Sequence, residues 1–206
     1  MMKNLRMAHT LTQPDDAYIP PELIGVTHMT LEQFEEVCRK YRKLRLELTS
    51  SGELIAMPPT GSLTGVHNSN LMYQLEVWAR QAQTGVCLGN TTGFVLPNNA
   101  IRSPDASWIR REKWYGLTEQ QKERFCPFCA DFVAELRSPT DRLPPLLRKM
   151  EEYMANGASL GWLIDPSTRR VYVYRPHEEV VVLENPQTVS GEPLLAGFTL
   201  NVSELW

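Results

Sequence analysis

The chain has 206 residues, of which 42% are apolar, and it carries a net charge of −3 at neutral pH. This size and composition predict an ordinary globular protein with a real buried core, and no repeat or low-complexity tract interrupts it. Because the whole chain is slightly negative, it cannot attract DNA through an overall positive charge. DNA affinity comes largely from Lys and Arg side chains that replace phosphate counterions. Any contact with nucleic acid must therefore come from a local basic patch.

The sequence carries no membrane or export signal that we recognise. No window approaches the ~20 uninterrupted apolar residues of a membrane-spanning helix, and the first residues lack the apolar run of a signal peptide. Of the four cysteines only Cys126 and Cys129 are close together, so neither a disulfide framework nor a four-cysteine zinc site is predicted. The pair could hold half a zinc site or a redox centre, or simply be loop or core cysteines. We expect a cytoplasmic protein without a membrane segment.

The first part of the chain predicts an arm and then a small helical and hairpin unit. Residues 1–28 contain prolines but no apolar periodicity, which indicates an N-terminal arm ahead of a single domain over residues 29–206. Thr30 and Gln33 form a capping box, which predicts a helix that ends near Tyr41. Two alternating runs, at 44–48 and 53–57, flank a Thr-Ser-Ser-Gly turn and predict a β-hairpin.

The rest of the chain alternates helix and strand patterns. A longer helix is predicted over 64–83, and a second amphipathic helix follows the Pro-Pro pair and closes at Asn156 and Gly157. A short helix or excursion is expected within 111–124. Strand patterns occur at 85–89, 93–97, 106–110, 131–136, 160–165, 170–175 and 180–184. The predicted class is α/β or α+β, with a mixed β-sheet flanked by helices.

Two acidic residues and a lysine stand out against this pattern. Asp105 follows Pro104 just before a predicted strand, and Glu135 lies inside the apolar strand DFVAEL, on the face that also carries Val133. A buried carboxylate is costly unless it is paired or protonated, so Glu135 indicates a metal, a basic partner or an exposed sheet edge. Lys149 lies at the border of the buried stripe of the last helix, from which its ammonium can reach a neighbouring sheet end.

These residue types suit the hydrolysis of a phosphodiester. A divalent cation held by two carboxylates polarises the phosphoryl group and lowers the pKa of an attacking water. A lysine beside it positions or activates that water and balances the developing charge. One Asp, one Glu and one Lys also recur by chance in any chain of this length, so their order and context must carry the prediction.

Four segments supply that context: ELIAMPPTGSLTGVHNSNL, RSPDASWI, FVAELRSPTD and LLRKMEEYMANGASLGWLIDP. Together they resemble the Uma2 family of restriction-endonuclease-like proteins, within the PD-(D/E)XK nuclease superfamily. The resemblance covers roughly residues 28–206 and depends on the order of Pro-Asp, Glu with a following Ser-Pro, and a helix with Lys and Tyr four apart. It implies a restriction-endonuclease-like fold and an endonuclease that hydrolyses DNA with Mg²⁺ or Mn²⁺. It further implies a homodimer.

The resemblance also implies roles for single residues. Asp105 and Glu135 correspond to the metal ligands, and Lys149 to a catalytic lysine displaced from the strand onto the following helix. The superfamily's usual lysine position is held by Arg137, which cannot act as a base near neutral pH and could bind phosphate or form a salt bridge. Glu47 and His67 match an acidic residue of the opening hairpin and a histidine of the long helix. Each is a candidate for the rim of the site, with an ordinary exposed or hydrogen-bonded role as the alternative.

Two other functions fit the same residues. One is a catalytically silent nuclease-fold module that binds nucleic acid or serves as an accessory protein, and the other is a hydrolase of a different phosphate ester. A broad groove would favour DNA and a closed pocket a small molecule. A local positive patch could come from the basic residues that flank the proposed site, which are Arg102, Arg110, Arg111, Lys113, Arg137, Arg142 and Arg148.

Overall fold

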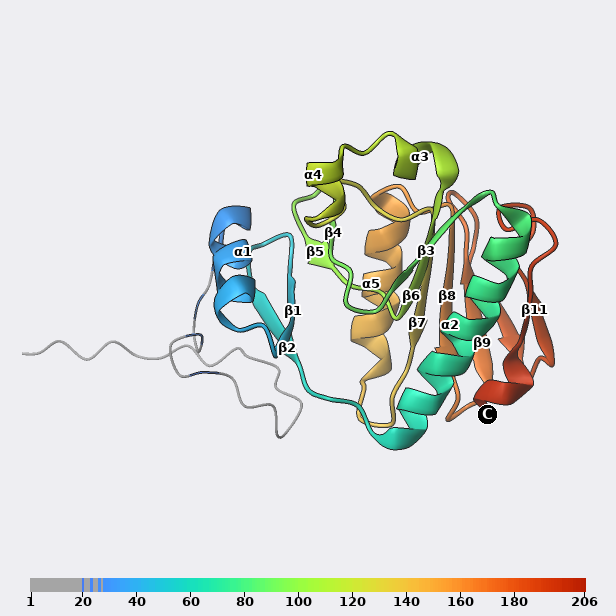
Figure 1. Ribbon diagram of the computed structural model, residues 1–206. Helices are drawn as coiled ribbons and strands as arrows, with labels where there is room; N and C mark the ends of the chain where they lie inside the picture. The colour runs from blue at the N-terminus through green and yellow to red at the C-terminus, as the bar shows by residue number, and fades with distance from the viewer. Residues whose placement is uncertain (1–19, 21–22, 24–25, 27) are drawn as a thin grey trace, which may run out of the picture.

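The centre of the molecule is a six-stranded mixed sheet in the order β10-β9-β8-β7-β6-β3. The computed structural model describes residues 20, 23, 26 and 28–206, so most of the expected N-terminal arm lies outside the described residues (Figure 1). β7 and β8 run parallel, and the other neighbouring pairs are antiparallel, which confirms the predicted mixed sheet. The strands span Gly85–Gly89 (β3), Ala106–Arg110 (β6), Phe132–Leu136 (β7), Leu160–Asp165 (β8), Arg170–Tyr174 (β9) and Val181–Glu184 (β10).

Two helices cover opposite faces of this sheet, α2 (Ser62–Ala82) and α5 (Leu143–Ala155) (Figure 1). The alternation of side chains along β7 shows how the faces are divided. Phe132 and Ala134 lie in the core beneath α2, whereas Val133 lies in the core beneath α5. Because Glu135 is two residues beyond Val133, its side chain points to the α5 side.

A smaller unit carries the hairpin. It consists of α1 (Leu31–Lys40) and a four-stranded sheet in the order β2-β1-β5-β4. The strands are β1 (Arg45–Leu48), β2 (Leu54–Met57), β4 (Phe94–Val95) and β5 (Ile101–Arg102). The capping box at Thr30 and the hairpin are both confirmed. β5 was not predicted, yet its pairing of Ile101 with Leu48 joins the hairpin to the segment that leads into Asp105.

The remaining elements refine the predicted boundaries. Helix α2 begins two residues earlier than predicted, and α5 includes both prolines in its first turn, where the missing N–H groups would have no intrahelical partner anyway. Two short helices occupy the polar stretch, α3 (Arg111–Tyr115) and α4 (Glu119–Lys122). A hairpin of β11 (Thr188–Ser190) and β12 (Thr199–Asn201) and a 3₁₀ helix (Val202–Leu205) complete the core beneath α2. No helix within the described residues is long and apolar enough to cross a bilayer.

The close packing of β3 against β6 gives a sharp stability prediction. A Cβ added to Gly85 would overlap the carbonyl oxygen of Ile109 and the ring of Trp108, whereas at Gly89, on the same strand, it would meet no atom within 4 Å. We expect Gly85→Ala to lower the free energy of unfolding by about 2 kcal/mol, because an extra carbon in a packed site forces the backbone to shift. Urea unfolding of Gly85→Ala beside Gly89→Ala checks this, and equal stability of the two variants would contradict it.

Candidate active site

Strand β1 brings two charged side chains to the edge of the main sheet. Leu46 and Leu48 pack in the small core around Phe34, so the alternating residues Arg45 and Glu47 point the other way. Arg45 reaches the segment before β6, and Glu47 reaches α5. The hairpin therefore contributes one cation and one anion to a charged cluster formed by β6, β7 and α5.

Glu135 is a buried member of this cluster on the main sheet. It lies on a central strand, is only 4% exposed, and faces α5. Its Oε1 is 2.7 Å from Nζ of Lys149 and accepts a 2.9 Å hydrogen bond from the Tyr153 hydroxyl. Lys149 and Tyr153 are one helical turn apart, so α5 holds the carboxylate with two successive side chains. The edge-strand explanation of Glu135 is therefore wrong.

Lys149 is shared between two carboxylates. Its Nζ also donates to Oε1 of Glu47 over 2.8 Å. Glu47 in turn accepts from the backbone N–H of Ser103 at 2.9 Å and from Arg102 at 3.1 Å. Arg102 completes the chain through a 2.6 Å contact with Glu152 of α5.

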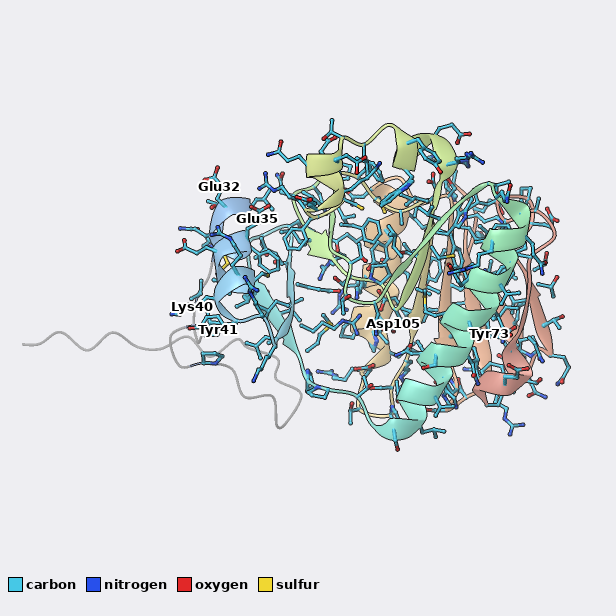
Figure 2. The ribbon with its side chains drawn as sticks, viewed as in Figure 1. Glu32, Glu35, Lys40, Tyr41, Tyr73 and Asp105 are labelled. Atoms are coloured by element: carbon cyan, nitrogen blue, oxygen red, sulfur yellow. The ribbon has the colours of Figure 1, made fainter. Side chains whose placement is uncertain are left out.

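Asp105 closes the cluster from its position just before β6 (Figure 2). Its Oδ2 accepts a 2.9 Å hydrogen bond from the backbone N–H of Leu136, the neighbour of Glu135, so the two acidic residues are fixed at adjacent strands. Its Oδ1 lies 3.2 Å from a terminal guanidinium nitrogen of Arg45. Asp105, at 8% exposed, is thus tied to the backbone on one side and to a charge on the other.

Counted over the described residues, the cluster holds more negative than positive groups. Four carboxylates (Glu47, Asp105, Glu135 and Glu152) face three cations (Arg45, Arg102 and Lys149). Burial raises the pKa of Glu135 to about 7; Lys149 opposes this rise, and the carboxylates of Asp105 and Glu47 add to it. Burial also acts to raise the pKa of Glu47, but Lys149 and Arg102 outweigh it and hold that pKa below its usual value. The surplus negative charge is therefore accompanied by a raised pKa at Glu135 and not at Glu47.

These residues fit a hard divalent cation. Mg²⁺ is commonly held by one or two carboxylates together with water and substrate phosphates rather than by a complete cage of protein ligands. The described residues contain no group of three or more His, Cys, Asp or Glu side chains arranged to hold a metal. Asp105 and Glu135, at adjacent strands and with oxygen donors only, match the smaller ligand set, and a cation beside them would offset the surplus charge.

The titration of Glu135 predicts how stability depends on pH in metal-free protein. A pKa raised from 4.5 to about 7 stabilises the fold fully below pH 4.5, and this contribution is lost as the pH rises through 7. Between pH 6 and pH 8 we expect the wild type to lose about 1 kcal/mol of unfolding free energy that Glu135→Gln does not lose. Urea unfolding in EDTA at both pH values measures the difference, and parallel pH profiles for the two proteins would contradict it.

The other residues singled out from the sequence lie elsewhere or have different partners. Arg137 donates to Asp165 of β8 over 2.7 Å, which is the salt bridge considered as its alternative role. His67 is buried on α2, burial lowers its pKa, and no contact with the charged cluster is observed within the described part of the chain. Cys126 and Cys129 are both buried free thiols, and burial raises the pKa of Cys129 to about 12.

Three members of the cluster were not predicted from the sequence, namely Arg45, Glu152 and Tyr153, and for Arg45 and Tyr153 the sequence did contain a signal. Arg45 was not among the candidate residues, although its spacing of two from Glu47 in the alternating run RLEL places both on one strand face. Tyr153 was noticed only as part of a motif, although its spacing of four from Lys149 places them on one face of a helix. In both cases the signal was the spacing from a residue that had already been identified, Glu47 for Arg45 and Lys149 for Tyr153.

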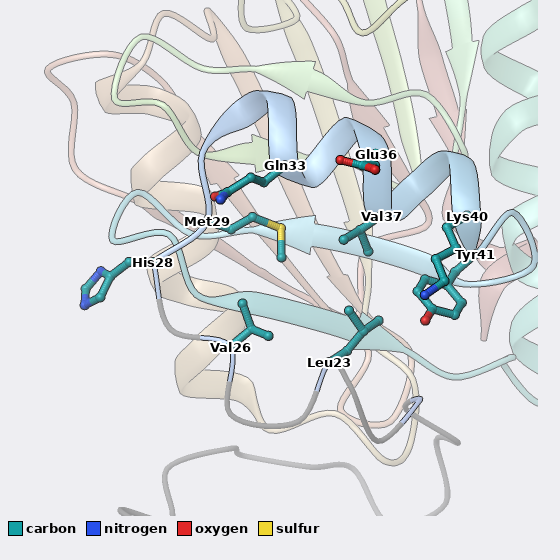
Figure 3. A pocket seen from close by; sticks show the side chains of 9 residues that line it. All are labelled: Leu23, Val26, His28, Met29, Gln33, Glu36, Val37, Lys40 and Tyr41. Carbon is teal, nitrogen blue, oxygen red and sulfur yellow. The ribbon is translucent and has the colours of Figure 1, made fainter.

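The cluster is separate from a pocket on the small unit. That pocket, of about 370 Å³, lies between α1 and residues that precede it, and Figure 3 shows the side chains of Leu23, Val26 and Val37 in its wall. None of the clustered carboxylates lines it. Its position therefore gives no support to a small-molecule site at Asp105 and Glu135.

Comparisons with known proteins agree with this fold. A solved structure, titled "Crystal structure of a putative nuclease belonging to DUF820 from Anabaena variabilis ATCC 29413", superposes with a TM-score of 0.69 at 20% identity and covers 86% of this chain and 97% of its own. At that identity the match shows the fold alone. No curated protein matches the sequence. The model of the Uma2 family, described as "Putative restriction endonuclease", matches residues 31–203. The chain therefore belongs to the Uma2 family.

Proposed function

We propose that the protein is a divalent-metal-dependent endonuclease that hydrolyses phosphodiester bonds of DNA. The observation that carries this proposal is the convergence of Asp105, Glu135 and Lys149, with Nζ of Lys149 2.7 Å from Oε1 of Glu135 in a buried cluster rich in carboxylates. Family membership supports a nuclease, and the residue types supply the chemistry of phosphodiester hydrolysis.

Five residues of the cluster have a defined part in this proposal. Asp105 and Glu135 would hold Mg²⁺ or Mn²⁺ through their carboxylate oxygens. When bound, the metal supplies Lewis-acid polarisation of the phosphoryl group and makes water more acidic. Lys149 orients the attacking water and offsets the negative charge that develops on the phosphoryl oxygens. Glu47 and Tyr153 hold Lys149 and Glu135 in place.

The two carboxylates beside Lys149 decide its protonation state. Burial acts to lower its pKa, but Glu135 and Glu47 outweigh burial, so the pKa is raised above the ordinary value of lysine. In the metal-free protein Lys149 is therefore an ammonium, which donates hydrogen bonds and cannot accept a proton. Its proposed role is accordingly to position water and stabilise charge, rather than to act as the general base.

Cleavage assays on several substrates test this function. Purified protein is incubated with supercoiled plasmid, linear duplex, single-stranded DNA and a small phosphodiester, each with Mg²⁺, with Mn²⁺ or with EDTA. The proposal predicts metal-dependent cutting of DNA. Hydrolysis of the small diester alone would indicate a different phosphoesterase, and DNA binding without turnover would indicate the catalytically silent module.

We also propose that the protein forms a homodimer, as the family resemblance implies. Two equivalent sites related by a two-fold axis could each cut one strand of a duplex. Light scattering of the purified protein across a concentration series measures the mass directly. A mass of one chain at all concentrations, alone and with DNA, would contradict the dimer without affecting the proposed chemistry.

A further inference from the structure

Arg45 contacts Asp105, one of the two proposed metal ligands. Its terminal nitrogen Nη2 donates to Oδ1 of Asp105 at 3.2 Å and to the carbonyl oxygen of Ser103 at 2.9 Å. The other oxygen of Asp105 is tied to the backbone of β7 through Leu136. Oδ1 is therefore the oxygen of Asp105 that can change partners without disturbing the sheet.

The charge around Arg45 comes from the whole cluster. Burial lowers the pKa of its guanidinium, but Asp105, Glu135 and Glu47 together outweigh burial and raise it. Three carboxylates from three different segments of the chain thus act on one cation. In the metal-free protein Arg45 is one of the three cations that partly balance the four carboxylates of the cluster.

The guanidinium is nevertheless incompletely bonded. Its Nε is buried and has no hydrogen-bond partner among the described residues, which is unusual because buried donors are nearly always paired. Its two hydrogen bonds to other described residues use the same nitrogen, and its side chain is 25% exposed. Arg102 differs in each respect, since it bonds Glu47 and Glu152 through two nitrogens and is 10% exposed. Arg102 is therefore held by two carboxylates. Arg45, in contrast, has an unused donor, Nε, and a side chain that is partly exposed to solvent.

We propose that Arg45 is a displaceable counter-cation of Asp105, which yields Oδ1 to the divalent metal and then binds a phosphate of the substrate. Arg suits the second role because its planar fork matches phosphate oxygens in a two-point hydrogen bond. This inference rests on the proposed metal-dependent function. It adds Arg45 as a positioning residue to Asp105, Glu135 and Lys149. It also predicts that metal binding and DNA binding are coupled.

The first test measures metal binding without DNA. Mg²⁺ and Mn²⁺ are titrated calorimetrically into metal-free wild type, Arg45→Met and Arg45→Gln, after thermal unfolding has shown that all are folded. Removing the competing guanidinium should tighten metal binding by about 10-fold. The matched control is Arg110→Met. Arg110 lies at the end of β6 away from Asp105 and pairs with Asp131, which keeps its ion pair with Lys113 in the variant. The control should shift the affinity less than about 3-fold.

The second test measures DNA binding in a background in which the loss of Lys149 is expected to slow cleavage strongly. Lys149→Met and the double variant Lys149→Met/Arg45→Met are compared by fluorescence anisotropy with a labelled duplex, once with Mg²⁺ and once with EDTA. Loss of Arg45 should weaken binding about 10-fold with Mg²⁺, because the released guanidinium then contacts phosphate, and less than about 3-fold in EDTA.

The outcomes separate this inference from the proposed function. Metal affinity that is unchanged or weaker in both Arg45 variants, while the wild type binds metal, would overturn the displacement of Arg45 and leave the nuclease proposal standing. An equal loss of DNA affinity with and without Mg²⁺ would overturn the coupling. Absence of metal binding in the wild type and in both Arg45 variants would overturn the inference together with the metal site on which it rests.

Discussion

Lys149→Met should lower the rate of metal-dependent DNA cleavage by about three orders of magnitude, the scale expected when a charged donor is removed from a preorganised reaction site. Methionine keeps much of the length and apolar surface of lysine, so α5 should still pack against the sheet. The variant loses the ammonium that contacts both Glu47 and Glu135 at 2.8 and 2.7 Å. Initial rates of plasmid nicking at saturating Mg²⁺ measure the effect.

The same variant should still bind metal, which separates charge stabilisation from metal loading. Asp105 and Glu135 remain in Lys149→Met, and removal of a competing cation should tighten Mg²⁺ binding rather than weaken it. Lys122→Met is a suitable control, because Lys122 pairs with Glu119 on α4, outside the charged cluster. A Lys149→Met protein that cleaves at the wild-type rate would remove Lys149 from the mechanism.

Asp105→Asn and Glu135→Gln should each weaken Mg²⁺ binding by about 100-fold and reduce cleavage to background, because a hard cation such as Mg²⁺ depends on carboxylate charge, which an amide does not supply. Both changes replace a charged oxygen donor by a neutral amide of nearly the same shape. The amide oxygen introduced at position 105 could still accept from the Leu136 N–H, and the one introduced at position 135 could still accept from the Tyr153 hydroxyl, so the fold should survive. Calorimetric titration and cleavage are measured on the same preparations.

Asp131→Asn provides the matched control for the two acidic ligands. Asp131 is also a buried aspartate and immediately precedes β7, but its contacts are with Arg110 and Lys113. Four residues along a strand separate it from Glu135 by roughly 13 Å, too far for the two to share one ion. Asp131→Asn should keep both metal affinity and cleavage. Loss of metal binding in this variant, with the fold intact, would place the metal elsewhere.

The main sheet and its two covering helices could be predicted because their patterns are local. The alternation in β7 correctly assigned Phe132, Ala134 and Leu136 to one face and Glu135 to the other, and the helical periodicity around Lys149 placed this residue beside the sheet. The capping box at Thr30 fixed the start of α1. Such short-range signals depend on neighbours within a few residues and survive without knowledge of the tertiary structure.

The pairing partners within the cluster could not be predicted in the same way. The contact of Glu47 with Lys149 joins residues 102 positions apart, and that of Arg45 with Asp105 joins residues 60 apart. Both depend on β5, a strand of two residues that is too short to show an alternating pattern. The position of β7 at the centre of the sheet, which excludes an edge-strand Glu135, is likewise a property of the topology.

The most direct test of the central claim is the conversion of supercoiled plasmid to nicked and linear forms by wild type and Glu135→Gln in parallel, each with Mg²⁺ and with EDTA. The proposed function predicts cutting by the wild type with Mg²⁺ only, and none by Glu135→Gln under either condition. Equal cutting by both proteins, or cutting that persists in EDTA, would contradict a metal-dependent nuclease centred on Glu135.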